Sequence, residues 1–190
     1  MAFLTEQQLR MMGFAELGTN VLISDKASIY GVSRIKIGNN VRIDDFCVLS
    51  AGEGGIEIGS YIHIAVYSSL IGAGKIKLAD FCNISSKVAI YSSNDDYTGE
   101  YMTNPMVPKE FTNVTNADVT IGKHVIIGSG TVIIPGVYIA DGVAIGSLSF
   151  VNSNCEPFNV YVGTPIRKVR KRSHNIVSLE SSLIKSEHKC

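Results

Sequence analysis

Aliphatic residues recur every six positions along most of the chain, with a few longer steps. The series is Ile23, Ile29, Ile37, Ile43, Leu49, Ile58, Ile64, Leu70, Leu78, Ile84 and Ile90, and then Ile121, Ile127, Ile133, Ile139, Ile145 and Val151. A period of six fits neither a helix nor a plain alternating strand. It predicts a coil of triangular cross-section in which each hexad forms one flat side and three hexads form one turn. Successive turns should stack about 4.8 Å apart, like strands in a sheet.

The hexads also carry small residues at a fixed place. Four positions after the aliphatic residue usually stands a small or β-branched one, and glycine often follows the aliphatic residue directly. We expect the small side chain to fit the tight inner corner and glycine to tolerate the turn. Cys47, Cys82 and Cys155 occupy the small slot, whereas Cys190 lies in the tail. Because no CxxC spacing occurs, we interpret the first three as core residues rather than metal ligands or nucleophiles.

The longer steps fall at one place in the coil. They separate Ile29 from Ile37, Leu49 from Ile58, Leu70 from Leu78 and Ile90 from Ile121. These breaks come once per turn, so the insertions should stack on one corner of the prism, which a random apolar pattern has no reason to do. The repeat therefore predicts an all-β fold, a parallel β-helix of hexapeptide repeats. Its seventeen hexads correspond to between five and six turns.

The segments around the coil divide the chain into three parts. Thr5 and Gln8 have the spacing of a capping box, which predicts a short helix from about residue 6 to 13 inside a capping segment 1–19. Such a helix should cover the open end of the coil, as solenoids require. The coil spans 20–166 and contains a long loop, 92–118, and 167–190 form a basic tail. The aromatic and acidic residues of the loop favour a functional role for it.

Composition and charge exclude several classes of protein. The 190 residues include 17 Lys and Arg and 17 Asp and Glu, so a globally basic nucleic-acid-binding protein is not expected. No apolar run approaches the roughly 18 residues of a membrane span. The first six residues turn polar too early for a signal peptide. We therefore expect a soluble, cytoplasmic protein with no nucleic-acid partner and no membrane span.

Positive charge is concentrated near the end of the chain. From Arg167 to Cys190 there are seven Lys or Arg residues and two Glu, and five of the basic residues lie within 167–172. Such a segment is either a solvated tail or a patch that holds phosphates beside the coil. A weak amphipathic helix is indicated by Ile176, Leu179, Leu183 and Ile184.

The last part of the coil carries a motif. It reads IGKHVIIGSG from Ile121 to Gly130, continues as IIPGV over 133–137, and ends in VGTP over 162–165, followed by Arg167. This pattern resembles the ending of the hexapeptide acyltransferases, above all the galactoside and maltose O-acetyltransferases and their relatives that acetylate surface polysaccharides. The resemblance covers about residues 20–172. It implies a left-handed β-helix, a homotrimer with active sites between neighbouring subunits, and acetyl-CoA as co-substrate with no metal required.

The same resemblance assigns residues to the co-substrate. The positions that match contacts to acetyl-CoA are Ser129, Ser147, Asn152 and Ser153, and the basic positions near the nucleotide phosphates are Arg167 and Arg170. An extended pantetheine arm can bond to the exposed backbone of a coil, and phosphates require Arg or Lys. The alternative for each serine is an ordinary solvent-exposed turn residue.

The long loop departs from the family pattern because it contains no histidine. The catalytic histidine of the close O-acetyltransferases falls at Asn94 or Asp95 in this chain. His63 directly precedes an inward aliphatic residue and should therefore point outward, where a base must be. It also lies in a His-Ile-Ala run like that of the lipid A acyltransferases. We expect His63 to be the general base, and its alternative is a plain surface histidine.

The remaining histidines are weaker candidates, and the loop carboxylates compete with His63. We interpret His124 as a wall residue of the CoA channel, while His174 and His188 lie in the tail. Asp95 or Asp96 could accept the proton, orient His63 across a subunit boundary, or form a turn, since Asn-Asp-Asp is a good turn sequence. We favour orientation of His63 or binding of the acceptor, because an ordinary Asp, with a pKa of about 4, is a weak base at neutral pH.

The acceptor is expected to be a saccharide. The residues assigned to its binding are Asn94, Asp96, Tyr97 and Ala65, with His63 and Asp95 as the catalytic pair. Together these features predict an acetyl-CoA-dependent O-acetyltransferase that transfers the acetyl group directly to a sugar hydroxyl of a surface polysaccharide or a related saccharide, with backbone N–H groups stabilising the oxyanion.

Three other functions remain open. The loop carboxylates would equally suit an N-acetyltransferase of a nucleotide-linked amino sugar. A non-catalytic β-helix module would explain the missing loop histidine. A γ-type carbonic anhydrase needs three histidines on a metal ion, whereas only His63 and His124 lie in the coil.

Overall fold

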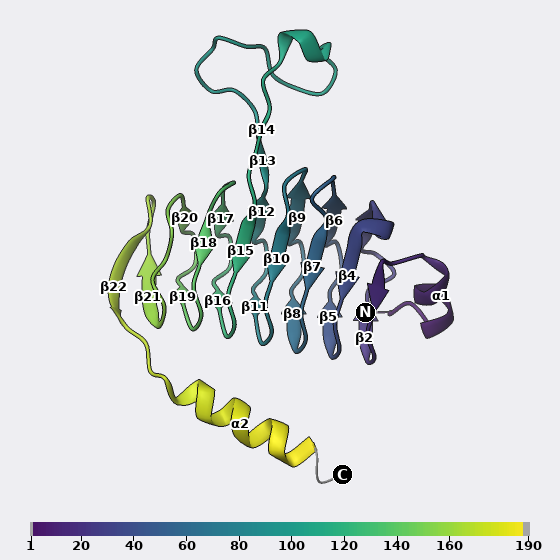
Figure 1. Cartoon of the computed structure of the whole chain (residues 1–190), viewed down its shortest axis with the longest axis vertical. Helices are drawn as coiled ribbons and strands as arrows, with labels where there is room; N and C mark the ends of the chain where they lie inside the picture. Colours follow the sequence, from purple (N-terminus) through teal and green to yellow (C-terminus); the bar gives the residue numbers. More distant parts are fainter. Residues whose placement is uncertain (1, 188–190) are drawn as a thin grey trace.

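The computed structural model describes residues 2–187 and consists of a parallel β-helix with a hairpin loop and two helices attached to it (Figure 1). The first side of the prism is a sheet of β1 (Glu16–Leu17), β4 (Ile35–Ile37), β7 (Ile56–Ile58), β10 (Ile76–Leu78), β15 (Val119–Ile121) and β18 (Tyr138–Ile139). All its strand pairs are parallel, and the left-handed β-helix expected from the hexapeptide pattern is confirmed.

The other two sides are sheets of the same kind. The second sheet contains β2 (Val21–Ile23), β5 (Val41–Ile43), β8 (Ile62–Ile64), β11 (Asn83–Ile84), β16 (Ile126–Ile127), β19 (Ala144–Ile145), β21 (Asn159–Val162) and the antiparallel β22 (Arg167–Lys171). The third sheet contains β3 (Ser28–Tyr30), β6 (Val48–Ala51), β9 (Ser69–Gly72), β12 (Ala89–Tyr91), β17 (Val132–Ile133) and β20 (Phe150–Val151).

The interior is filled by the hexad residues. Every aliphatic residue of the six-residue series is buried except Ile29, which is half-buried at the N-terminal end. Cys47, Cys82 and Cys155 are also buried, and burial raises the pKa of the Cys82 thiol to about 12 and that of Cys155 to about 11. Thiols with such pKa values are not nucleophiles at neutral pH, so the core interpretation of these cysteines is confirmed.

The β-helix is longer than the five to six turns predicted. Two sides have six strands, and the second side has seven parallel strands before β22. The first additional strand is β1, whose Leu17 stands six positions before Ile23. The last is β21, in which the buried position is taken by Tyr161, an aromatic residue outside the aliphatic series. A search for aliphatic hexads therefore stops one strand short at each end.

The three corners of the prism have different chemistry. We name the corner between the first and second sheets the first corner, that between the second and third sheets the second corner, and that between the third and first sheets the third corner. Aromatic residues with left-handed φ values stack on one another from turn to turn. At the first corner Tyr61 and Phe81 have ring centroids 4.8 Å apart, and at the second corner Phe46 and Tyr67 are 5.0 Å apart.

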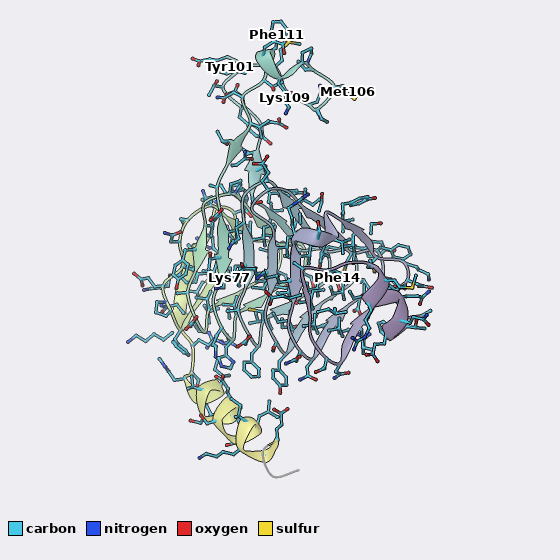
Figure 2. All side chains as sticks on the ribbon, turned by 45° about the vertical axis from the view of Figure 1, so that its right-hand side comes forward. Phe14, Lys77, Tyr101, Met106, Lys109 and Phe111 are labelled. Carbon is cyan, nitrogen blue, oxygen red and sulfur yellow. The ribbon has the colours of Figure 1, made fainter. Side chains whose placement is uncertain are left out.

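The insertions all leave the prism at the third corner, as the spacing predicts. The largest follows β12 and begins as a hairpin of β13 (Ser93–Asn94) and β14 (Thr115–Asn116). Beyond the hairpin the loop, which includes a 3₁₀ turn over Lys109–Phe111, extends away from the prism (Figure 1). Its labelled tip residues Tyr101, Met106 and Phe111 lie far from the sheets in Figure 2.

A helix stands at each end of the chain. The N-terminal helix α1 (Glu6–Met11) begins with the predicted capping box, in which Thr5 N–H donates to Gln8 Oε1 at 2.8 Å, and it buries Leu9. It ends two residues before the expected limit. The C-terminal helix α2 (Asn175–Glu187) lies outside the prism. Among residues 2–187 no helix is both long enough and apolar enough to cross a membrane.

Candidate active site

The second sheet presents a column of polar side chains to the outside. Arg42, His63 and Asn83 occupy the same register position on β5, β8 and β11. The next positions of this column, Ile126 and Ala144 on β16 and β19, are apolar. The column is thus polar on the three strands β5, β8 and β11, lies between apolar Leu22 on β2 and apolar Ile126 on β16, and changes from polar to apolar next to the turn from which the long loop leaves.

A buried carboxylate organises the polar half. Asp44 is 5% exposed, and its two oxygens accept hydrogen bonds from Arg42 Nε at 2.7 Å and His63 Nε2 at 2.8 Å. Burial raises the pKa of Asp44, but the bonds from Arg42 and His63 outweigh this effect, and the pKa lies below its ordinary value. Because the carboxylate can only accept, His63 holds its proton on Nε2, and Nδ1 is the acceptor of the neutral ring.

His63 points outward as expected, with its side chain 42% exposed. Its partner, however, is Asp44 of its own chain and not a carboxylate of the loop. The second sheet lies opposite the third corner of the prism, where the loop leaves. The two expected catalytic residues, His63 and Asp95, therefore lie on opposite sides of one chain.

The base of the loop holds the predicted acidic residues in unequal environments. Asp95 is exposed and takes part in none of the hydrogen bonds or ion pairs recorded among residues 2–187. Asp96 forms a turn: its carboxylate accepts from Thr98 Oγ1 at 2.9 Å and from the backbone N–H of Gly99 at 2.9 Å. Desolvation raises the pKa of Asp96, but these bonds lower it below its ordinary value. Of these two aspartates, Asp95 is therefore the one whose carboxylate is available to a ligand.

The remaining acceptor-binding candidates are spread out. Asn94 belongs to β13, and its carbonyl accepts from Thr115 Oγ1 at 3.3 Å, so it stiffens the hairpin. Tyr97 is 87% exposed at the loop. Ala65 is buried directly after β8, one turn before Ser85 on the second corner. One chain alone does not bring these residues together.

The predicted co-substrate serines fall on two different corners. Ser129 and Ser147 follow β16 and β19 on the second corner in consecutive turns, and the Leu148 N–H donates to the Ser129 carbonyl at 2.9 Å. Between them, Gly130 has a φ of +73°, and a Cβ there would lie 2.7 Å from Leu148 Cδ2. This corner is a band of backbone and small side chains, which suits an extended amide chain. Asn152 and Ser153 follow β20 on the third corner.

The basic segment forms an edge strand and does not remain a free tail. β22 pairs antiparallel with β21, and all five of its residues, including Arg167 and Arg170, are exposed. Lys168 is paired with Glu156 at 2.6 Å. The strand therefore presents two arginines that have no carboxylate among their recorded contacts within residues 2–187, which is the chemistry that phosphate groups require.

The other described histidines, His124 and His174, make contacts near the C-terminal helix. His124 lies on the first corner, stacks on Phe81 at 5.0 Å, and bonds through Nε2 to Glu180 Oε2 at 2.7 Å. His174 stacks on Phe158 at 3.8 Å, and His188 lies outside the described residues. Within residues 2–187 no group of His, Cys, Asp and Glu side chains is arranged to hold a metal ion.

Sequence reasoning missed Asp44, Asn83, Ser85 and Glu180. A turn in the N-terminal part of the coil takes 20 or 21 residues, so adding that number to Arg42 and His63 would have revealed Asn83 as the next member of the column. Ser85 occupies the next outward position along the chain, at the second corner. Glu180 could not have been found in this way, because the place of α2 against the prism has no sequence period.

Comparison with known proteins decides the family. No protein-family model matches the chain. The dTDP-4-amino-4,6-dideoxy-D-glucose acyltransferase of Escherichia coli is 59% identical over 95% of this chain and 94% of its own length. The chain belongs to the hexapeptide-repeat acyltransferases. AntD, an N-acyltransferase from Bacillus cereus solved with dTDP and 3-hydroxybutyryl-CoA, has a TM-score of 0.94 at 45% identity and covers 98% of both chains.

These relatives overturn the expected O-acetylation of a sugar hydroxyl. A maltose O-acetyltransferase from Clostridium difficile 630 reaches only a TM-score of 0.59 at 23% identity, over 89% of this chain and 75% of its own, which reflects the fold alone. The acyltransferases that match almost from end to end are instead named for an amino sugar or for N-acylation. The expectation was wrong because it rested on the last hexads and their ending, which O-acyltransferases and N-acyltransferases of this fold can share.

Proposed function

We propose that this acyltransferase transfers the acetyl group of acetyl-CoA to the 4-amino group of a dTDP-linked 4-amino-4,6-dideoxy sugar. The observation that carries the proposal is the exposed Asp95 carboxylate at the base of the loop, where the O-acetyltransferases have a histidine. The near full-length similarity to an acyltransferase of that amino sugar and to AntD supports the acceptor and the CoA thioester donor.

An amine acceptor explains why no loop histidine is needed. A sugar hydroxyl is a poor nucleophile until a base near its own working pH removes the proton. An amine attacks through its lone pair and has to lose a proton only as the new bond forms. A carboxylate is sufficient for that purpose, and it also attracts the protonated amine into the site. The bound ammonium first releases one proton to solvent, which gives the neutral amine with the lone pair that attacks. Asp95, exposed and without a competing cation in the recorded contacts of residues 2–187, is suited to both tasks.

The reaction is a direct displacement. The amine nitrogen attacks the thioester carbonyl carbon, and the proton from nitrogen passes to the Asp95 carboxylate. The carbon–sulfur bond of the tetrahedral intermediate then breaks, and the CoA thiolate leaves and is protonated. The products are an N-acylated sugar nucleotide and free CoA. Holding both substrates in line provides a large part of the rate, because a bimolecular step becomes intramolecular.

A spacing argument favours Asp95 over Asp96. AntD has been solved with substitutions of one aspartate and one serine that are ten positions apart in that chain. In the corresponding part of this chain, the pairs Ser85–Asp95 and Ser86–Asp96 have that spacing. Asp96 is engaged in its own turn, which leaves Ser85 and Asp95. We assign Ser85, on the second corner, and His63, one turn away, to positioning the acceptor.

The two halves of the site come from different copies of the chain. The loop that carries Asp95 leaves the prism at the third corner, while His63 and Ser85 lie on the opposite side of the prism. A trimer of heterologous contacts, as the family resemblance implies, would place the loop of one copy against the second sheet of the next. CoA would then run along Ser129 and Ser147 with its phosphates near Arg167 and Arg170, and Asn152 and Ser153 would approach it from a neighbouring copy.

The test is the chemistry of the product. We expect that dTDP-4-amino-4,6-dideoxyglucose and acetyl-CoA yield an amide at C4, identified by mass and by the chemical shift of the C4 proton. The matched acceptor with a 4-hydroxyl group should react at least about tenfold more slowly, because general-base help of the kind a hydroxyl needs is worth more than that. Equal rates on the two acceptors, or acetylation at another position of the amino sugar, would contradict the proposal.

A further inference from the structure

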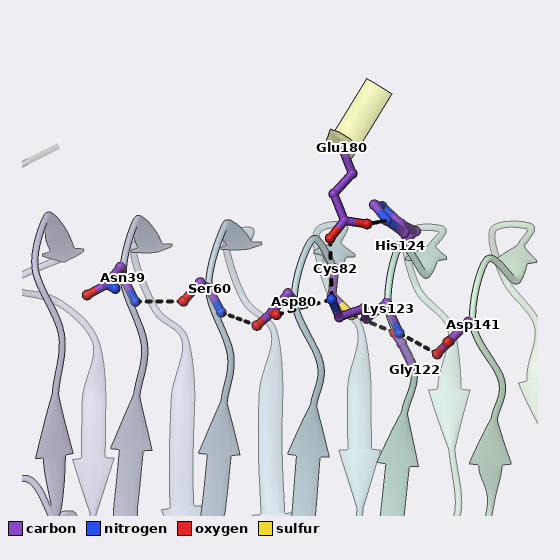
Figure 3. Close-up of polar contacts among 9 residues, drawn as sticks. All are labelled: Asn39, Ser60, Asp80, Cys82, Gly122, Lys123, His124, Asp141 and Glu180. Carbon is purple, nitrogen blue, oxygen red and sulfur yellow. Dashed lines mark hydrogen bonds and ion pairs between the residues drawn. The ribbon is translucent and has the colours of Figure 1, made fainter. Parts of the chain in front are cut away.

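The C-terminal helix is attached to the first corner by polar contacts. Glu180 on α2 bonds to His124 at 2.7 Å and to Lys123 Nζ at 3.3 Å (Figure 3). At the end of the helix, Glu187 accepts from the Tyr61 hydroxyl at 2.5 Å. None of the side chains of α2 is buried, and a groove of about 310 Å³, partly lined by Leu179 and Leu183, lies between helix and corner. The apolar side chains of α2 face Phe81 across this groove without being buried, so the polar contacts are the direct bonds between helix and corner.

The anchoring point coincides with a break in a regular ladder. Along the first corner, the backbone N–H of one turn donates to a side-chain oxygen of the next. Asn39 donates to Ser60 Oγ at 3.0 Å, Ser60 to Asp80 Oδ1 at 2.8 Å, and Lys123 to Asp141 Oδ1 at 2.8 Å (Figure 3). Lys123 has no oxygen to offer to Asp80, so the ladder is interrupted there, and its ammonium group lies 3.7 Å from Asp80. The Glu180 carboxylate joins the corner at this break.

The attachment depends on the charge of Glu180. The hydrogen bond from His124 lowers the pKa of Glu180, burial opposes this, and Lys123 adds to the lowering, so that the pKa lies below its ordinary value. The other charged groups at this point are Lys123 and Asp80 on the corner. A depressed carboxyl pKa stabilises the docked helix above the unfolded value of about 4.3, and the stabilisation is lost as the pH falls through the lower, folded value. The protection factors of the α2 amides should therefore fall as the pH drops below about 4.3, before those of the prism amides do. A parallel fall in both sets of protection factors would contradict this.

The residues before α2 connect it to the basic strand. Arg172 directly follows β22, and its Nη1 donates to the carbonyl oxygens of His124 at 2.8 Å, Gly142 at 3.0 Å and Val143 at 3.2 Å. His174 stacks on Phe158 in the next part of the segment. β22 itself is an exposed edge strand with a single neighbour, β21. Its far end is thus fixed by Arg172 and, beyond it, by the helix.

We propose that residues 172–187 form a strap that holds β22 in place for binding the phosphates of CoA, with Glu180, His124 and Arg172 as positioning residues. The inference rests on the proposed function, in which Arg167 and Arg170 bind those phosphates. An edge strand that is ordered before binding loses less conformational freedom when the ligand arrives, and affinity rises accordingly. The strap touches neither substrate, so it should affect the binding of CoA and not the chemical step.

The test separates binding of the phosphates from the rest of the reaction. In the full-length enzyme, Glu180→Gln should raise the KM for acetyl-CoA about 3- to 10-fold, and Glu180→Lys, which repels Lys123, should raise it further. The KM for the sugar nucleotide, kcat, and the KM for acetyl-pantetheine, which lacks all phosphates, should not change. Ser182→Lys, which adds the same side chain at an exposed position of α2, is the matched control. The melting temperature of the prism should be the same in all variants.

The outcomes distinguish failure of the strap from failure of the proposed function. If Arg170→Ala weakens acetyl-CoA binding but both Glu180 variants leave its KM unchanged, the strap does not position β22. If the Glu180 variants raise the KM for acetyl-pantetheine as much as that for acetyl-CoA, the effect is a general loss of structure, and the proposal is overturned. If Arg170→Ala leaves acetyl-CoA binding unchanged, the phosphate role of β22 fails, and with it the premise of the strap.

Discussion

Replacement of Asp95 by Asn is expected to lower kcat for N-acylation by about 10²- to 10⁴-fold, the range that general-base assistance provides. Asn has the shape of Asp but cannot take the proton that the amine must lose. Asp95 has no recorded hydrogen-bond or ion-pair partner within residues 2–187, so the substitution should not disturb the loop. Steady-state kinetics with the amino-sugar nucleotide, together with calorimetric titration of CoA, measure the two effects separately.

The control for this prediction lies next to it in the chain. Asp96→Asn retains an oxygen that can accept the turn hydrogen bonds from Thr98 and Gly99, and it should leave kcat within about threefold of the wild-type value, as surface substitutions usually have small effects. The assignment would be wrong if Asp96→Asn were the more damaging of the two, or if Asp95→Asn kept a tenth or more of the activity. Loss of CoA binding in Asp95→Asn would instead indicate a structural role for the loop carboxylate.

The fold was predictable because its determinants are periodic. Each hexad places one aliphatic residue at the core, and the breaks after Ile29, Leu49, Leu70 and Ile90 put every insertion on the third corner. The prediction failed where a different residue type takes the same position, as Tyr161 does in β21. A period of aliphatic residues in the sequence shows which positions are buried. It underestimates the length of the β-helix wherever a residue of another type fills the buried position.

The candidate site was only partly predictable, since its contacts join turns of unequal length. His63 and its outward direction follow from the hexad pattern, but its partner Asp44 stands 19 residues away on the preceding turn. The hydrophobic pattern aligns β5 with β8, but it does not show that the side chain of Asp44, at the corner after β5, turns back to the outward His63. Asp96 shows the opposite case, because the turn chemistry of Asn-Asp-Asp predicts its hydrogen bonds from three or four neighbouring letters.

The acceptor could not be read from the motif that identified the family. The repeated IG hexads and the VGTP ending belong to the C-terminal turns, where Gly128 and Ser147 form a band of backbone beside apolar Ile126 and Ala144. Such a surface fits a thioester arm and gives no information about what receives the acyl group. The N-terminal turns differ: their column of Arg42, His63 and Asn83 is polar and is fixed by a buried carboxylate. In the proposed site, the donor would therefore bind along the C-terminal turns and the acceptor along the N-terminal ones.

Two inactive variants are expected to restore activity to each other when they are assembled together. One carries Asp95→Asn, and the other carries His63→Ala with Ser85→Ala. In a closed ring, the loop of each copy would complete the second-sheet surface of the next copy. A site is then intact when its loop, with Asp95, comes from the His63→Ala, Ser85→Ala variant and its second-sheet surface, with His63 and Ser85, comes from the Asp95→Asn variant. With random mixing in equal amounts, about a quarter of the sites meet this condition, since each of the two contributions is intact half of the time in a heterologous ring.

The experiment requires co-expression with two different tags and isolation of assemblies that carry both. In a heterologous trimer every assembly that carries both variants has one intact site of its three, so we expect activity near one third of the wild-type value per site, against losses of about 10²-fold or more for each variant alone. A mixture of Asp95→Asn with Asp95→Ala is the matched control, because both copies then lack the same group and no arrangement can restore it. If the first mixture stays as inactive as this control, Asp95 and the residues of the second sheet do not meet across a subunit boundary. To reach His63 of its own chain, the loop would then have to fold back around the prism, whereas in the structure it extends away from the prism.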